Sequence, residues 1–98
     1  MFVTFIYIFM KCIKITITGR VQGVWFRKHT KERADELGIL GTVQNIMDRS
    51  VLIIAQGEEN NLNEFLKYCH KGSPLSNVTN VSSEDLIPQD LSSFEILK

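Results

Sequence analysis

The chain has 98 residues, of which 44% are apolar and 22% are charged, and its formal net charge is zero. This length suits one domain with one core, and zero net charge excludes a general electrostatic attraction to nucleic acid. The charge is nevertheless uneven. Residues 1–49 carry eight Lys and Arg against four Asp and Glu, whereas residues 50–98 carry three against seven. The positive excess lies around Gly19–Arg33 and favours a local anion site.

The cysteines indicate the compartment in which the protein works. Cys12 and Cys69 are too few for a disulfide framework, and they lack the spacing of metal ligands. We therefore expect two buried or half-buried thiols in a reducing cytoplasm, with no metal bound by the chain.

The first ten residues form an apolar run, MFVTFIYIFM. This run is too short to cross a bilayer, which needs about 20 apolar residues. It also lacks the basic leader and the cleavage site that are typical of a secretion signal. We expect residues 1–9 to be an N-terminal extension, with Met10 as a candidate natural start, and residues 10–98 to form the domain.

The first predicted strand and helix flank a loop bracketed by glycines. Cys12–Thr18 alternates isoleucine with other residues, as a half-buried strand does. The loop Gly19–Val24 follows it. A helix is predicted next, because residues suited to one face recur at spacings of four, four and three, namely Phe26, Thr30, Ala34 and Leu37. Gly38 stands where a left-handed C-terminal cap is expected.

The middle of the chain predicts a β-hairpin and a second helix. Thr42–Met47 and Val51–Gln56 are rich in β-forming residues, and Asp48-Arg49-Ser50 supplies a turn between them. The second helix has an apolar stripe made of Leu62, Phe65, Leu66 and Cys69. Asn61 and Glu64 resemble a capping pair at its start, and Gly72 is expected to end it.

Two further strands complete the predicted sheet. Val78–Glu84 is one of them, and its valines at 78 and 81 break the alternation and indicate a bulge. Ser92–Leu97 is a short final strand with Phe94 and Ile96 on one face. The order β-α-β-β-α-β contains two split βαβ units, which form one largely antiparallel sheet with two helices on one face. We therefore predict an α+β, ferredoxin-like sandwich, a fold that by itself carries no function.

The loop that enters the first helix, GRVQGVWFR, contains the candidate anion-binding residues. Helix N-termini present unpaired N–H groups and a positive dipole end, and glycines let successive N–H groups face one concavity. A tight turn without function has the same glycine pattern. More informative are Arg27, Lys28 and His29, which occupy the first helical turn, where the dipole disfavours cations.

These residues also have structural interpretations. From spacing alone, Arg27 fits a solvent-facing arginine beside the helix, and His29 fits a surface residue. Lys28 and Lys31 are each four residues before an acid, Glu32 or Asp35, which is the spacing of surface ion pairs.

Asn45 is the second unusual residue. We expect it mid-strand on the same side as Val43 and Met47, where an amide is a poor β-former. A buried amide needs hydrogen-bond partners, so a structural asparagine is the alternative to a functional one.

Taken together, these blocks resemble the acylphosphatase family. The resemblance rests on GRVQGVWFR, on the Ala34–Gly38 and Gly41–Asn45 segments, and on VLIIAQG at Val51–Gly57, and it runs from about Cys12 to Lys98. It implies that Arg27 binds phosphate and that Asn45 orients the attacking water. It also implies a phosphate cradle formed by the backbone of Arg20, Val21, Gln22, Gly23, Val24 and Trp25.

One position departs from the family pattern. Arg49 stands in the hairpin turn where the family usually has Gly. If the turn keeps a left-handed residue there, the arginine costs roughly 1–2 kcal/mol.

The resemblance implies a cytoplasmic, metal-independent enzyme without cofactor that hydrolyses acyl phosphates to carboxylate and inorganic phosphate by direct attack of water. We expect a monomer with a small-molecule substrate and no nucleic-acid or membrane partner. One alternative is a non-catalytic ferredoxin-like binding module, although the predicted central strands, CIKITIT and VLIIAQ, lack the aromatic residues on which RNA bases stack. The other is an accessory domain that handles carbamoyl phosphate in a larger assembly.

Overall fold

The computed structural model describes residues 10–98, so the expected extension at residues 1–9 lies outside the described residues. The elements, in chain order, are β1 (Lys11–Arg20), α2 (Phe26–Leu37), β2 (Leu40–Asn45), β3 (Val51–Gly57), α3 (Glu59–Lys71), β4 (Asn77–Leu86) and β5 (Phe94–Leu97). This order confirms the predicted β-α-β-β-α-β arrangement with a short additional C-terminal strand.

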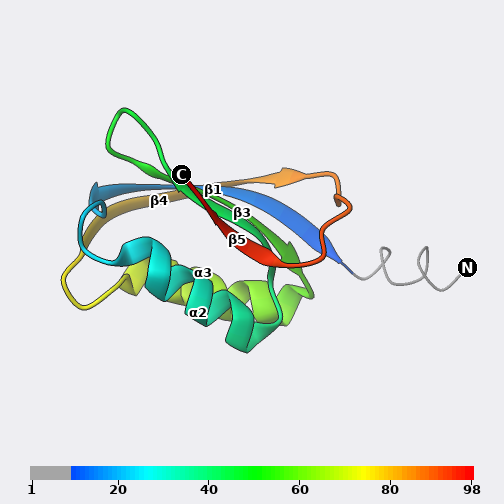
Figure 1. Cartoon of the computed structure of the whole chain (residues 1–98). Coiled ribbons are helices and arrows are strands. Elements are labelled where there is room, and N and C mark those ends of the chain that lie inside the picture. The colour runs from blue at the N-terminus through cyan, green and yellow to red at the C-terminus, as the bar shows by residue number, and fades with distance from the viewer. Residues whose placement is uncertain (1–9) are drawn as a thin grey trace, which may run out of the picture.

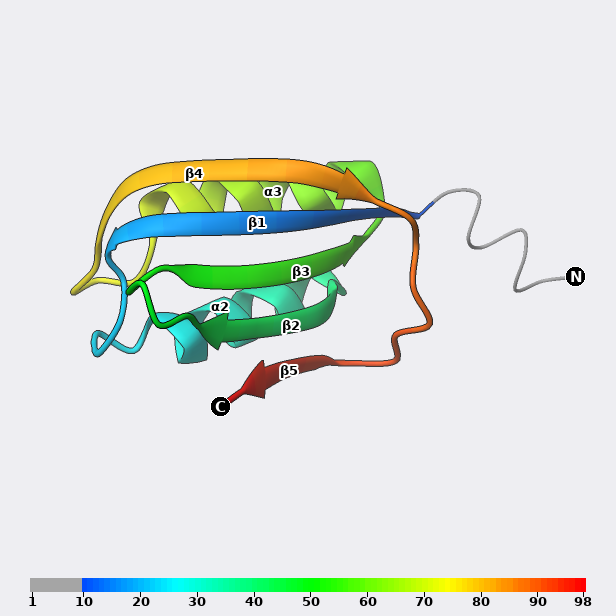
Figure 2. The same ribbon diagram turned by 90° about the horizontal axis from the view of Figure 1, so that it is seen from above.

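The strands form one sheet in the order β4-β1-β3-β2-β5. All neighbouring strands are antiparallel except β2 and β5, which are parallel. Both helices cover one face of this sheet (Figure 1), and the strand order is visible from above (Figure 2). The predicted central strands, β1 and β3, lie inside the sheet, and the ferredoxin-like α+β fold is confirmed.

The core lies between the sheet and the two helices. Ile13, Ile15 and Ile17 of β1 are buried on the helix side, as their alternation predicts, and they pack against Phe26 of α2 and Phe65 of α3 in one cluster. Burying a side chain of this size contributes about 1.5–3 kcal/mol. No helix within residues 10–98 is long and apolar enough to cross a membrane.

The two cysteines are buried free thiols, as expected. Burial raises the pKa of Cys69 to about 12 and also raises the pKa of Cys12. Both thiols therefore remain protonated at neutral pH.

Two predicted boundaries are wrong. The second helix was expected to start at the pair Asn61 and Glu64, but α3 begins at Glu59 with Glu58 as its N-cap. The Glu58 carbonyl already accepts a hydrogen bond from the fourth residue after it, at 2.9 Å, so the helical pattern starts there. The first hairpin strand ends at Asn45 and does not reach Met47, which lies fully exposed in the turn.

The predicted irregularity in β4 is a β-bulge. One extra residue of β4, Thr79, lies opposite the step from Thr18 to Gly19 in β1. The bulge lets Val78 and Val81, which are three positions apart, both pack against the core. Gly19 has a φ of 127°, and a β-carbon there would lie 2.2 Å from a carbonyl oxygen of β4, so only glycine fits where the chain leaves the sheet.

Three connections meet at one end of the sheet, where the site was predicted. They are the β1–α2 loop, the β2–β3 turn and the α3–β4 connection (Figure 2). The fold thus places the glycine-bracketed loop beside the end of β2, which carries Asn45.

Candidate active site

The β1–α2 loop is anchored to the core by buried side chains and leads into the start of α2. Val21 and Val24 are buried in the core. Gly23 and Trp25 both have left-handed backbone, with φ of 72° and 62°. Turns with left-handed residues bring successive N–H groups into one concavity, which is the geometry of an anion-binding nest.

The loop N–H groups are available to a ligand. Within residues 10–98, those from Gln22 to Trp25 have no main-chain acceptor. The buried hydroxyl of Ser73, in the α3–β4 connection, donates a hydrogen bond of 2.9 Å to the Val24 carbonyl. Because the C=O and N–H of one trans peptide point in opposite directions, this contact turns the Trp25 N–H away from Ser73.

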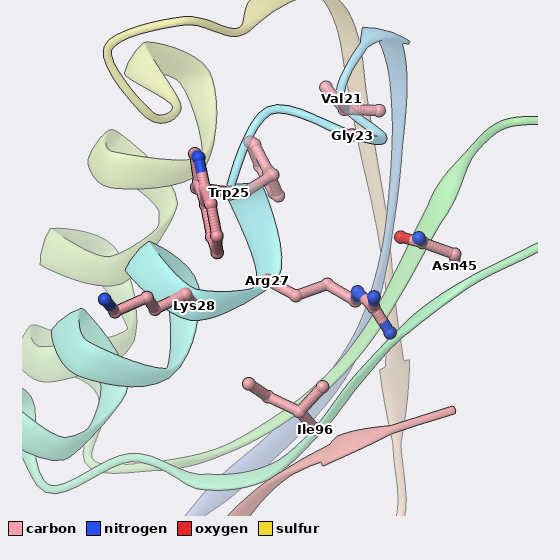
Figure 3. Close-up of a pocket in the computed structure, with 8 residues that line it drawn as sticks. Val21, Gly23, Trp25, Arg27, Lys28, Asn45 and Ile96 are labelled. Carbon is pink, nitrogen blue, oxygen red and sulfur yellow. The ribbon is translucent and has the colours of Figure 1, made fainter.

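Arg27 lies in the first turn of α2, which contains no acidic residue. Its Nη1 donates a hydrogen bond of 3.1 Å to the Leu97 carbonyl of β5. Within the described chain it forms no ion pair with a carboxylate. A guanidinium has five N–H donors, so this one neutral contact leaves most donors and the full charge for an anion. The side chain extends from α2 toward β2 (Figure 3).

The basic residues after Arg27 follow their predictions only in part. Lys31 pairs with Asp35 at 3.2 Å, as the spacing indicates. The expected pair between Lys28 and Glu32 is not formed, because the Lys28 ammonium instead lies 5.8 Å from the centroid of the Trp25 ring, within the range of a cation–π contact.

Asn45 is the last residue of β2, and its side chain points toward the guanidinium of Arg27 (Figure 3). Its Oδ1 atom is buried and has no hydrogen-bond partner within residues 10–98. An unsatisfied buried acceptor costs about 1–3 kcal/mol, and such atoms in native structures call for a ligand, a water or another specific explanation. This oxygen is therefore suited to accept a hydrogen bond inside the pocket.

The predicted site residues divide between two neighbouring cavities. A pocket of about 380 Å³ brings together most of them, and its lining residues are Val21, Gly23, Trp25, Phe26, Arg27, Lys28, Asn45 and Ile96. Arg20 and Gln22 instead line an adjacent cavity of about 500 Å³. The side chain of Val24 is buried beneath the loop. Within residues 10–98 there is no group of three or more His, Cys, Asp or Glu side chains that could hold a metal ion.

Gln22 has a role that the sequence did not indicate. Its Nε2 donates hydrogen bonds to the carbonyls of Ile46, at 2.9 Å, and Ser50, at 2.8 Å. These two residues close the β2–β3 turn, since the Ile46 N–H donates to the Ser50 carbonyl. Gln22 therefore clamps the loop to the base of the hairpin, next to Asn45. No local pattern reveals a contact between residues so far apart in the sequence.

The β2–β3 turn keeps the left-handed residue that the family pattern implied. Three residues connect the closing pair, and the third, Arg49, has a φ of 76°, as in the common three-residue hairpin loop. The Asp48 carboxylate accepts hydrogen bonds from the hydroxyl and the N–H of Ser50. These bonds, the hydroxyl's above all, lower the pKa of Asp48.

Comparison with known proteins agrees with this geometry. The acylphosphatase family model matches residues 13–96. The acylphosphatase of Thermotoga petrophila is 47% identical over 87 residues, which cover 89% of this chain and 97% of that protein. The acylphosphatase structures from Coxiella burnetii and Bacillus subtilis each superpose with a TM-score of 0.87, at 33% and 36% identity. Each match covers 90% of this chain, together with 93% and 99% of the respective structure. The chain therefore belongs to the acylphosphatase family.

Proposed function

We propose that this protein hydrolyses acyl phosphates to a carboxylate and inorganic phosphate. Membership of the acylphosphatase family supports the activity, and the three acylphosphatases compared above are matched over 93% or more of their own length, which favours an independent enzyme over an accessory domain. One observation carries the assignment of the site. The guanidinium of Arg27, without an acidic partner among residues 10–98, and the unsatisfied oxygen of Asn45 face the same pocket beside the loop N–H groups.

The phosphoryl group binds between Arg27 and the loop. A guanidinium forms paired, charge-assisted hydrogen bonds with phosphoryl oxygens. The loop N–H groups from Gln22 to Trp25 and the N-terminus of α2 stabilise the remaining negative charge. The Leu97 carbonyl, through its hydrogen bond to Nη1, holds the guanidinium at the pocket.

Asn45 positions the attacking water. Its unsatisfied Oδ1 accepts a hydrogen bond from one water O–H and so aims the water oxygen at phosphorus. The bond from that oxygen to phosphorus forms as the bond from phosphorus to the acyl oxygen breaks, and the carboxylate leaves with the electron pair. The proton from water passes to a phosphoryl oxygen, so no base from the protein is needed.

The chemistry of the leaving group explains the choice of substrate. A carboxylate leaves as an anion whose conjugate acid has a pKa of about 4, so it needs no proton donor. An alkoxide, with a pKa nearer the value of roughly 15.7 for water, would need a general acid. The lining residues of the pocket include two cationic side chains, Arg27 and Lys28, and the amide of Asn45, but no carboxyl or imidazole group, which suits an acyl phosphate better than a phosphate monoester.

Substitution of the two side chains tests this assignment. Asn45→Ala should lower kcat for benzoyl phosphate by about 10²–10³, as removal of one aligned polar group does in other enzymes, with little change in KM. Arg27→Ala should abolish phosphate binding and turnover together. Unchanged hydrolysis by Asn45→Ala would contradict the role of Asn45, and inorganic phosphate as a competitive inhibitor measures binding separately.

The activity should not depend on a metal ion. Charge stabilisation is assigned to Arg27 and to the N–H groups, so we expect the same kcat for acetyl phosphate before and after dialysis against EDTA. A loss of activity that Mg²⁺ or Zn²⁺ restores would contradict the mechanism.

We further propose that residues 10–98 are the catalytic domain and that residues 1–9 are an extension which turnover does not require. The family match at residues 13–96 supports this boundary. A chain that starts at Met10 should then have an unchanged kcat. We also propose that the enzyme is cytoplasmic, in keeping with its two free buried thiols. We further propose that it acts as a monomer. A molecular mass equal to that of a dimer, measured by sedimentation in solution, would contradict the proposed monomer.

A further inference from the structure

A second cavity lies beside the active-site pocket and shares Val21 with it. Its volume is about 500 Å³, and it is lined by Gly19, Arg20, Val21, Gln22 and Arg49. We propose that Arg20 and Arg49 form a second anion-binding subsite for a negatively charged group on the acyl part of the substrate. This inference rests on the proposed function and specifies which acyl phosphates the enzyme prefers.

The first support is charge without compensation. Neither Arg20 nor Arg49 forms an ion pair within residues 10–98, whereas five other basic side chains of this part of the chain do. Both arginines line the same cavity, so an anion that binds there is close to two positive charges that have no acidic partner. The carboxylate next to Arg49 in the sequence, Asp48, is already engaged by the hydroxyl and N–H of Ser50.

The second support is the backbone of Arg49. Its φ of 76° is left-handed, which costs a residue with a β-carbon roughly 1–2 kcal/mol. A glycine would adopt this conformation without strain. Strained residues of this kind gather at ligand sites, and here the strained residue, Arg49, lines the cavity.

The third support is the rigidity of the cavity walls. Arg20 and Arg49 come from segments 29 positions apart in the sequence. The two hydrogen bonds from Gln22 to the base of the turn fix these segments against each other. The backbone on both sides of the cavity is therefore held in place, so a bound anion has to order only the two exposed arginine side chains.

The ligand follows from this arrangement. With the phosphoryl group at Arg27, an acyl chain that passes over the loop can bring a terminal carboxylate or phosphate to the arginine pair, which both anions engage by paired hydrogen bonds. An uncharged acyl group of the same length cannot form these paired, charge-assisted hydrogen bonds with Arg20 and Arg49. The structure thus predicts a preference for acyl phosphates with a second negative charge.

The test compares succinyl phosphate with butyryl phosphate, which has the same number of carbon atoms but no second charge. In the parent enzyme we expect a lower KM for succinyl phosphate. Arg49→Gly and Arg20→Gln should each raise this KM by about 10-fold, the effect of losing one charge-assisted hydrogen bond, and Arg49→Gly should leave KM for butyryl phosphate and both kcat values unchanged. Lys71→Gln, which removes a charge at the end of α3, is the matched control and should change neither KM.

Other outcomes have clear meanings. An equal rise of KM for both substrates would show that the arginines act only on the phosphoryl group, and it would overturn the subsite. Equal KM values in the parent enzyme would do the same. Failure of the parent enzyme to hydrolyse butyryl phosphate would instead contradict the proposed function. A thermal melt of each variant excludes misfolding, and an acyl phosphate with a terminal phosphate shows which anion the subsite prefers.

Discussion

Strain near the site is confined to a few single residues. Among residues 10–98, Trp25 and Arg49 are the non-glycine residues with positive φ, and each lines one of the two neighbouring cavities. The unsatisfied oxygen of Asn45 lies in the same region. Three residues thus violate local preferences at one end of the molecule, which is where a folded protein concentrates function.

The cost of one such residue is measurable. Arg49→Gly should raise the free energy of unfolding by about 1 kcal/mol, because glycine adopts the left-handed conformation without strain. Urea unfolding at pH 7 measures this change. Met47→Gly is the control in the same turn: its side chain is fully exposed and its φ is not positive, so glycine there should lower stability by about 0.5–1 kcal/mol. Equal effects of the two substitutions would contradict the strain at Arg49.

At the scale of elements, the loop geometry depends on contacts from distant segments. The β2–β3 hairpin receives the side chain of Gln22, the α3–β4 connection provides the Ser73 hydroxyl, and β5 provides the carbonyl that binds Arg27. Each element therefore fixes a different part of the site. Gln22 links the β1–α2 loop to the region of Asn45, because its side chain donates a hydrogen bond to the carbonyl of Ile46, the residue after Asn45.

Gln22 should therefore act on turnover through Asn45. We expect Gln22→Leu to lower kcat for benzoyl phosphate by about 10-fold, because the loss of two hydrogen bonds releases the hairpin from the loop. In an Asn45→Ala background the same substitution should change kcat little, since the group that it positions is absent.

Two variants complete this experiment. Gln22→Glu keeps the shape but directs a carboxylate at two carbonyl groups, so it should be at least as damaging as Gln22→Leu. Gln44→Leu, on β2, changes a half-buried glutamine for which the described chain offers no side-chain hydrogen bond, and it should leave kcat unchanged. Full additivity of Gln22→Leu and Asn45→Ala would refute the positioning role.

At the scale of the whole molecule, the core contains two groups that resist ionisation. Burial is the main cause that raises the pKa of Tyr68 to about 12, against a smaller opposing effect of its hydrogen bond with Thr30. Burial likewise raises the pKa of Cys69 to about 12. Both groups are charged only when deprotonated, so they stay neutral to a higher pH in the folded state than in the unfolded state.

Stability should consequently fall in alkali. A raised folded pKa contributes stability that is fully present below the unfolded values, near 9 for Cys69 and 10 for Tyr68, and that is lost as the pH rises to about 12. Urea midpoints measured from pH 7 to 12 should decline above pH 9. Cys69→Ala should show a shallower decline, although its midpoint at pH 7 is lower because of the cavity. A flat profile in the parent would contradict this account.

Much of the fold could be predicted, because its signals are local. The alternating isoleucines of β1 face the helices, and Gly38 ends α2 with a φ of 68° while the next N–H donates to the Ala34 carbonyl. The broken alternation at 78 and 81 is a bulge. The helix start predicted from Asn61 and Glu64 is wrong, because the same pair of residue types also occurs inside helices, and the first hydrogen bond of α3 already joins Leu62 to the Glu58 carbonyl.

The sequence by itself determined the order of elements, the faces that are buried, and Arg27, Asn45 and the loop as candidates, since periodicity and motif spacing depend on residues close to one another. Only the tertiary structure decided the clamp by Gln22, the support of Arg27 by β5, and the separation of Arg20 from the pocket of Arg27. These contacts join segments up to 70 positions apart. Such contacts form only after the sheet has brought distant segments together, so the residues adjacent to them in the sequence do not predict them.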